Sequence, residues 1–323
     1  MDALLDSIVS FLETIGLTAF FSPNKRVYYP YLLAALVLAS IYYWFLRQSK
    51  QQKSIPKWLQ YIFPKSIWLH PSALVDYQLF VFNNVLKIVL IAPYFIAHGA
   101  FAYVVVYWWE TAIGIQDNVQ WSASSINISY TIVFMLCSDF SRFFLHYCLH
   151  KIPFLWEFHK VHHAAEVLTP ITLYRIHPIE YMLFRLRSVF IFGLVTGSFF
   201  FWFRTGIEPI HSFQIHIGLF IFNMLGANLR HSHVPISFGR YLEHWLISPA
   251  QHQIHHGQAE RFYDKNFGSF LAIWDWLFGS LMLSNPKEKI DFGIEPEEQT
   301  EFRSFWKNLW LPFRNFFQRI SPF

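Results

Sequence analysis

Histidines gathered in three short clusters are the residues of this chain best suited to chemistry. On a helix, residues three or four positions apart share a face, so each cluster can point two or three imidazoles in one direction. Neutral imidazole is a good ligand for iron, zinc, copper or nickel and a poor one for magnesium or calcium. The clusters read HYCLH, HKVHH and HQIHH, and they contain His146 and His150; His159, His162 and His163; and His252, His255 and His256. Two HxxHH strings and one HxxxH string in one chain predict a metal centre.

The number of clustered histidines indicates two metal ions. Eight imidazoles exceed the four to six ligands that one ion takes. Soluble di-iron bundles use Glu and Glu-x-x-His pairs, but the one such string here, Glu208 to His211, contains Pro209 and falls in a predicted outside loop. We therefore expect an all-histidine centre. Five further histidines are expected to be ordinary residues: His70, His98, His211, His216 and His244.

The composition indicates a membrane protein. Of 323 residues, 54% are hydrophobic, 20% aromatic and only 14% charged, which is too little charge to cover a soluble domain of this length. The net charge of +4 is small and the basic residues are dispersed, so no nucleic-acid partner is expected. Cys137 and Cys148 are too few for a disulfide framework.

Five segments are candidate membrane spans, which need about 20 mainly apolar residues. They cover residues 27–46, 79–109, 126–144, 189–203 and 213–228. The second is long enough to tilt, and Pro93 is expected to kink it. Gly193 and Gly197 in the fourth have the GxxxG spacing of close helix packing. The count falls to four if the second or fourth segment enters and leaves on one side.

Basic residues in the short loops predict the orientation. The loop after the first span carries five of them, whereas residues 110–125 carry no Lys or Arg. By the positive-inside rule the first loop is cytoplasmic and the second lies outside. Alternation then places residues 146–187 and everything after residue 228 on the cytoplasmic side. The basic residues of the first loop are Arg47, Lys50, Lys53, Lys57 and Lys65.

Two terminal segments are candidates for the membrane surface. Residues 1–17 begin with acidic rather than basic residues, which argues against a signal peptide, and their apolar positions have helical spacing. Residues 302–323 combine aromatic residues at helical spacing with four basic residues, and Pro312 interrupts them. An interfacial helix and a helix packed on the protein itself explain this second pattern equally well.

The histidine clusters resemble those of the fatty acid hydroxylase and sterol desaturase superfamily of membrane di-iron oxygenases. The order HxxxH, HxxHH, HxxHH matches, and the likeness covers about residues 138–283, including RIHPIE (175–180), LRHSHVPIS (229–237), DKNFG (264–268) and IWDWLFGS (273–280). It is greatest to bacterial proteins labelled as a sterol desaturase family. The resemblance implies that His177 and His231 complete a set of ten ligands. His233 and Trp276 depart from the family, which often has Asn and Arg at these positions.

Five carboxylates are candidates to hold the outer nitrogens of ligating imidazoles, as carboxylates commonly do in metal sites. For each of them, helix capping or surface solvation explains the residue as well. They are Asp139, Glu157, Glu180, Asp264 and Asp275.

These patterns predict an all-α protein, a polytopic membrane helix bundle of four or five spans with a cytoplasmic, helical, histidine-rich cap. Residues 1–125 are expected to form an interfacial helix and the first two spans. Residues 126–285 are expected to form a fatty acid hydroxylase-like catalytic domain, and residues 286–323 a C-terminal interfacial tail.

The resemblance implies an iron-dependent oxidoreductase that uses O2 to hydroxylate or desaturate a membrane lipid, whether fatty acyl, sterol or related isoprenoid. Its cofactor would be two iron ions, for which zinc can substitute during expression. No redox domain is recognisable, so electrons are expected from an external donor such as a b-type cytochrome or ferredoxin system. The alternative is a non-redox membrane zinc protein, either a structural site or a hydrolase, since two closed tetrahedral sites also use eight histidines. A metal transporter fits less well, because the clusters gather at one membrane face rather than along the midplane.

Overall fold

The computed structural model describes residues 16–23, 25–49, 56–117, 119–204, 220–285 and 288–320, except for the side chains of residues 88–96 and 320. Within these ranges every regular element is a helix. Extended backbone pairs there only in two isolated bridges, Leu246 with Leu271 and Gly257 with Phe292. The prediction of an all-α protein is confirmed.

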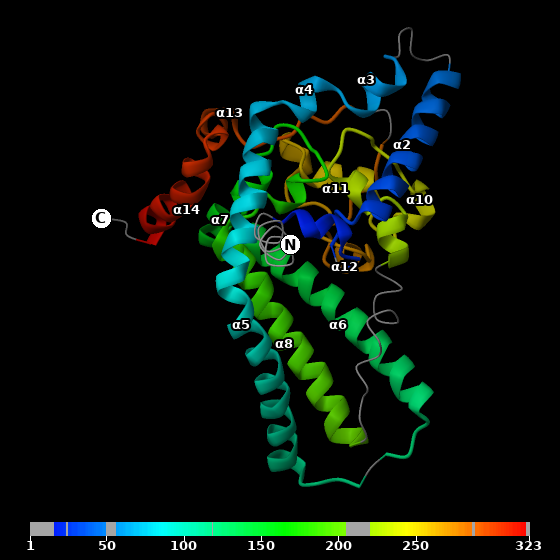
Figure 1. Ribbon diagram of the computed structural model, residues 1–323, viewed down its shortest axis with the longest axis vertical. Coiled ribbons are helices and arrows are strands. Elements are labelled where there is room, and N and C mark those ends of the chain that lie inside the picture. Colours follow the sequence, from blue (N-terminus) through cyan, green and yellow to red (C-terminus); the bar gives the residue numbers. More distant parts are fainter. Residues whose placement is uncertain are drawn as a thin grey trace, which may run out of the picture.

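Three long helices run side by side and extend away from a compact cap (Figure 1). They are α5 (Pro71–Ile113), α6 (Ala123–Lys151) and α8 (Pro178–Phe203). α8 packs against both α5 and α6. A Cβ atom at Gly193 or Gly197 would collide with Phe101 or Val105 of α5. The predicted GxxxG pair therefore lets α8 and α5 approach closely.

Three of the described helices are long and apolar enough to cross a membrane: α2 (Tyr29–Gln48), α6 and α8. They correspond to the first, third and fourth expected spans. The second expected span lies within α5, whose 43 residues would extend about 65 Å, roughly twice the thickness of a hydrocarbon core. α5 continues as one helix through Pro93, so it is long enough both to cross a bilayer and to enter the cap.

The fourth expected span, residues 189–203, lies within α8, and two other predictions fall partly outside the described residues. α8 begins at Pro178, before that span, because its first turns belong to the cap, where Glu180 and Tyr181 are buried. Residues 213–219 of the expected fifth span and residues 1–15 of the N-terminal segment lie outside the described residues. The described end of the fifth span is helical at residues 220–224 and leads into η3 (Ala227–Arg230).

Short helices form the cap and join it to the long ones. Leu79 of α5, Val161 of α7 and Phe302 pack in one apolar core, which ties α5 to the cap. α2 packs beside the cap through Ala35 and Ala39, which share a second core with Leu229. The short elements are η1 (Leu17–Phe21), α3 (Trp58–Ile62), α4 (Lys65–Trp68), α7 (Pro153–His163), η2 (Thr172–Tyr174), α10 (Gly239–Leu242), α11 (Pro249–His255), η4 (Glu260–Phe262), α12 (Ile273–Leu277), α13 (Pro296–Gln299) and η5 (Glu301–Arg303).

The C-terminal helix α14 (Phe305–Ile320) packs on α7 with one face and is exposed on the other. Leu311 is buried, and Arg319 donates a hydrogen bond to Glu157 of α7. Trp306 and Trp310 are 74% and 65% exposed. The helix therefore packs on the protein while presenting large aromatic side chains at the surface.

Candidate metal centre

Four short stretches of the cap and its adjoining helix bring nine of the ten expected histidines together. The last two turns of α6 carry His146 and His150. α7 starts directly after α6 and carries the HKVHH string, while His231 is the C-cap residue of η3. α11 and its C-cap carry the HQIHH string, and a capping box between Ser248 and Gln251 fixes the start of that helix.

The nine imidazoles form two groups. Within each group, one ring nitrogen of every histidine lies within 4.8 Å of those of the others. Eight of the nine side chains are buried, and His150 is partly buried. Group 1 consists of His146, His150, His159, His163 and His255, and group 2 consists of His162, His231, His252 and His256.

Each HxxHH string contributes to both groups. In α7, His159 and His163 belong to group 1 and His162 to group 2; in α11, His252 and His256 belong to group 2 and His255 to group 1. The members that stay together are four residues apart and therefore lie on one helical face. The third histidine is rotated from that face and reaches the neighbouring group. The spacing HxxHH thus lets one helix serve two adjacent ions.

Backbone carbonyls fix the tautomer of three of these rings. Nδ1 of His146 lies 2.7 Å from the carbonyl of Phe267, that of His255 lies 2.8 Å from the carbonyl of Lys265, and that of His162 lies 3.2 Å from the carbonyl of Arg175. A carbonyl can only accept, so each Nδ1 carries the proton and donates it. Nε2 of each neutral ring therefore holds a lone pair that is free to bind a metal.

A buried carboxylate does the same for His159. Its Nδ1 lies 2.9 Å from Oε1 of Glu180, and both side chains are almost fully buried. Nε2 of His159 then faces Nε2 of His146 at 3.0 Å. With both Nδ1 atoms protonated, two lone pairs point at one another, which is unfavourable unless a cation lies between or beside them.

Several other ring nitrogens are buried without any hydrogen-bond partner among the described residues. Buried polar atoms are rarely left unsatisfied, and each such atom calls for an explanation. A metal ion at each group would satisfy one nitrogen of each of these rings, so the donor set fits two ions held by neutral imidazoles. These nitrogens are Nε2 of His150, His163 and His255, Nδ1 of His252, and both nitrogens of His256.

The surroundings keep the cap histidines neutral. Burial, with some help from repulsion by neighbouring imidazoles, lowers the pKa of His162 to about 3. For the same reasons the pKa values of His159, His163, His231 and His255 lie well below the ordinary value. The same holds for His252 and His256. At neutral pH these rings do not carry protons that a metal would first have to displace.

Of the five carboxylates expected to hold imidazoles, Glu180 does so. Asp139 and Asp275 instead support the loop that carries the Phe267 carbonyl: Asp139 accepts from the backbone of Phe270 and Leu271, and Asp275 from Phe267 and Gly268. They act on His146 through that loop. Asp264 lies 3.9 Å from Nδ1 of His150 and pairs mainly with Lys151, while Glu157 pairs with Lys160 and Arg319.

His177 is not brought together with the other nine. Its Nδ1 caps α8 by accepting from the backbone of Ile179, and its Nε2 lies 3.2 Å from the carbonyl of Leu309. His233 also lies outside both groups, with its Nε2 2.7 Å from the carbonyl of Tyr61. His231, which the family resemblance alone suggested, is a member of group 2.

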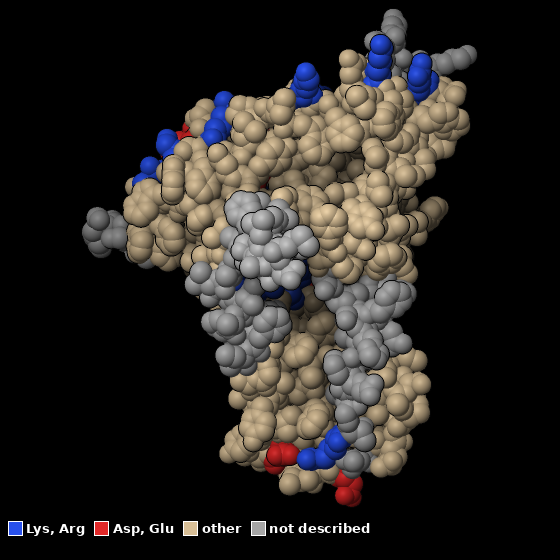
Figure 2. All heavy atoms as spheres, in the orientation of Figure 1, with Lys and Arg blue, Asp and Glu red and all other residues tan. Residues whose placement is uncertain are grey.

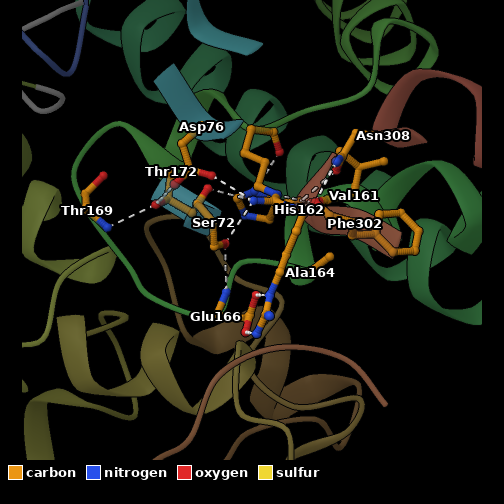
Figure 3. A network of polar contacts seen from close by, with 12 residues as sticks. Ser72, Asp76, Val161, His162, Ala164, Glu166, Thr169, Thr172, Phe302 and Asn308 are labelled. Carbon is orange, nitrogen blue, oxygen red and sulfur yellow. Dashed lines mark hydrogen bonds and ion pairs between the residues drawn. The ribbon is translucent and has the colours of Figure 1, made fainter. Parts of the chain in front are cut away.

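Arg175 is a supporting residue that sequence reasoning did not single out. Its guanidinium is fully buried and binds Asp76 and Ser72 of α5, the carbonyl of Val161, and the carbonyl of Phe302. Its own carbonyl holds His162, so the network in Figure 3 connects α5, α7 and the C-terminal segment to group 2. The only signal in the sequence was its place in the RIHPIE string.

Both groups border a cavity of about 530 Å³ between the cap and the long helices. His146 and His159 of group 1 line it, together with His162, His231 and His252 of group 2. Phe134, Phe184 and Phe222 provide apolar parts of its wall. The volume lies within the range of small-molecule sites, roughly 300–1,000 Å³.

Comparison with known proteins agrees with this geometry. Residues 131–280 match the fatty acid hydroxylase family. This part of the chain is similar to the fatty acid hydroxylase family. All nine grouped histidines lie inside the matched segment of this hydroxylase domain, and the superfamily resemblance seen in the sequence is confirmed.

Curated relatives of the hydroxylase domain carry the names of lipid enzymes. The chain is 26% identical over 192 residues to human alkylglycerol monooxygenase, covering 57% of this chain and 39% of the relative. It is 29% identical over 156 residues to alkylglycerol monooxygenase of Xenopus tropicalis, covering 48% and 31%. It is 24% identical over 198 residues to a putative Delta(7)-sterol-C5(6)-desaturase 2 of Arabidopsis thaliana, covering 60% and 58%. The matches thus span about a third of the two monooxygenases. No solved structure matches the chain significantly.

Proposed function

We propose that this protein is a membrane-bound, O2-dependent di-iron oxidoreductase that hydroxylates or desaturates a lipid. The observation that supports this most directly is the convergence of nine neutral imidazoles in two adjacent groups on the wall of one cavity. In hydroxylation, R–H, O2, two electrons and two protons would give R–OH and water. In desaturation, the same O2, two electrons and two protons, together with two hydrogens removed from neighbouring carbons, would give a double bond and two waters.

Iron, when bound, would supply the O2-activating chemistry that side chains lack. The nine proposed ligands are those of groups 1 and 2; His177 is not among them. Group 1 offers five imidazoles, one more than a closed tetrahedral zinc site uses. Neither group contains a carboxylate ligand, so Glu180 would act on a bound ion only through its hydrogen bond with His159.

The protein would bring an apolar substrate to this centre from the bilayer. The cavity lies where α5, α6 and α8 meet the cap, and its wall includes phenylalanines of α6 and α8. Burial of the imidazoles limits the access of water to the reacting carbon. Electrons would come from an external donor, such as a b-type cytochrome or ferredoxin system.

We further propose a multi-pass topology with the cap in the cytoplasm. In Figure 2, Lys and Arg atoms lie along the cap surface farthest from the ends of the three long helices. This asymmetry is the one that the positive-inside rule describes. We also propose the three segments expected from the sequence: an interfacial helix and two spans in residues 1–125, the catalytic domain in residues 126–285, and an interfacial tail in residues 286–323.

The test combines metal analysis with lipid profiling. Full-length protein purified without added metal should contain about two irons per chain, and host lipids should gain an oxidised or unsaturated product when it is present. His163→Ala should abolish the product, whereas His244→Ala, outside both groups, should not. Zinc-only protein that stays inactive after iron loading would favour the alternative of a non-redox zinc protein, to which the four imidazoles of group 2 are also suited.

A further inference from the structure

The cavity that borders the histidines is also lined by an excess of basic side chains. Six Lys and Arg residues line it, against two acids, Asp139 and Glu180. In Figure 2, blue Lys and Arg atoms are visible inside the hollow between the cap and the long helices. The basic residues are Lys25, Arg26, Lys87, Arg142, Arg185 and Arg230.

The two acids do not neutralise this charge by direct pairing. Asp139 accepts hydrogen bonds from the backbone of Phe270 and Leu271 and from the Trp274 indole. Glu180 is engaged by His159. Among the described residues, no carboxylate lies within ion-pairing distance of Lys25, Arg26, Lys87, Arg142 or Arg230.

One of the six cations has a structural role, and Arg142 and Lys87 make contacts that leave their charge without a carboxylate partner among the described residues. Arg230 donates to the carbonyls of Ser269 and Ile247, which places it in the wall. Arg142 lies over the ring of Phe184, and Lys87 donates to Asn84. Neither contact supplies a negative charge.

The cations come from separate elements and repel one another. Lys25 and Arg26 precede α2, Lys87 belongs to α5 and Arg142 to α6. Burial, with repulsion from Arg142, lowers the pKa of Arg26 to about 10, and burial with repulsion from Arg185 lowers that of Lys25. Burial and mutual repulsion disfavour the charged forms of these side chains, yet all of them line one cavity. A negative ligand bound there would offset both effects.

The cationic part of the cavity lies close to the metal centre. Arg142 and His146 are four residues apart on α6, and both line the cavity. Residues with that spacing have Cβ atoms about 5–6 Å apart on one helical face. A headgroup bound at Arg142 would therefore leave the attached chain next to group 1.

We propose that the substrate of this centre is a lipid with an anionic headgroup, carboxylate or phosphate, held in the cavity by Arg26, Lys87 and Arg142. Calling this lipid the substrate rests on the proposed function, but its binding does not require turnover. Hydrogen bonds to charged groups are stronger than those between neutral groups, so loss of one cation should weaken anion binding about tenfold or more.

The test measures binding to full-length, metal-free protein in detergent. Three single-chain lipids are compared: lysophosphatidate, palmitate and neutral monopalmitoylglycerol. At least one anionic lipid should bind about tenfold or more tightly than the neutral one, and the tighter anion identifies the headgroup. Arg142→Gln and Arg26→Gln should lose this preference. Arg142→Lys should keep much of it, and Arg240→Gln, an exposed control on α10, should behave as wild type.

Two controls keep the result interpretable. Unchanged binding of the neutral lipid shows that a variant is folded. Equal affinity for all three lipids in wild type, or equal loss for all three in Arg142→Gln, would overturn the inference. Oxidation is assayed separately on iron-loaded protein. Selective binding of anionic lipid without oxidation refutes the proposed function alone. Oxidation together with equal affinity for anionic and neutral lipids refutes this inference alone.

Discussion

Replacing Glu180 by Gln should weaken metal binding at group 1 by about 10- to 100-fold. The Glu180 carboxylate accepts the Nδ1 proton of His159 at 2.9 Å, and the two side chains are 2% and 3% exposed. Gln keeps the size of the side chain and an accepting oxygen but lacks the carboxylate. A carboxylate that accepts the Nδ1 proton increases the basicity of the ligating Nε2. Such outer partners typically affect metal affinity by 10- to 100-fold, which is about 1.4–2.8 kcal/mol.

The assay is an anaerobic titration of metal-free protein with Fe(II) in competition with a chelator of known affinity. Glu157→Gln is the matched control, since Glu157 is also a buried carboxylate of the cap but contacts Lys160 and Arg319 instead of an imidazole. It should bind metal as wild type does, even if its unfolding temperature falls. Unchanged affinity in Glu180→Gln, or an equal loss in both variants, would refute the role assigned to Glu180.

Three further predictions concern the rest of the centre. His150→Ala and His256→Ala should each lower the metal content from two ions towards one, because each removes a ligand of a different group; elemental analysis that still finds two ions in both would contradict the grouping. His177→Asn should retain both ions and remove a pH dependence of the free energy of unfolding. Burial lowers the pKa of His177 to about 4, so its contribution to stability is fully present above about pH 6.5 and is lost as the pH falls towards 4. The loss is about 2 kcal/mol at pH 5. Wild type should therefore lose stability relative to this variant in thermal unfolding at pH 5 but not at pH 7.5. Arg175→Met should lower the free energy of unfolding by about 3–5 kcal/mol, since it leaves Asp76 buried without its partner; an unfolding temperature equal to that of wild type would show that the network contributes little.

Local spacing made much of the centre predictable from sequence. Four-residue intervals such as His146–His150 place imidazoles on one helical face wherever the helix lies. The number of clustered histidines indicated two ions. The basic residues of the first loop predicted that all three clusters lie on one membrane face. The structure brings His252, His255 and His256 together with the others, because α11 packs against η3 and its imidazoles contact those of α7.

What could not be predicted depends on contacts between distant segments. The assignment of His162 and His255 to opposite groups follows from how α7 and α11 face each other, which neither string contains. The backbone carbonyls of Phe267, Lys265 and Arg175 hold imidazoles. Every residue has such a carbonyl, so the residue types at these positions do not reveal the contact. The start of α8 was missed for a related reason, since cap burial rather than hydropathy decides it.

The sharing of α7 and α11 between the two groups links the occupancy of one ion to that of the other. An ion bound by His159 and His163 also fixes the orientation of α7, and with it the direction of His162 toward the second ion. The entropy of ordering these helices is then lost once rather than twice, so the second ion should bind more tightly than the first. Removal of a ligand from one group should therefore also weaken, without abolishing, the binding of the ion at the other group.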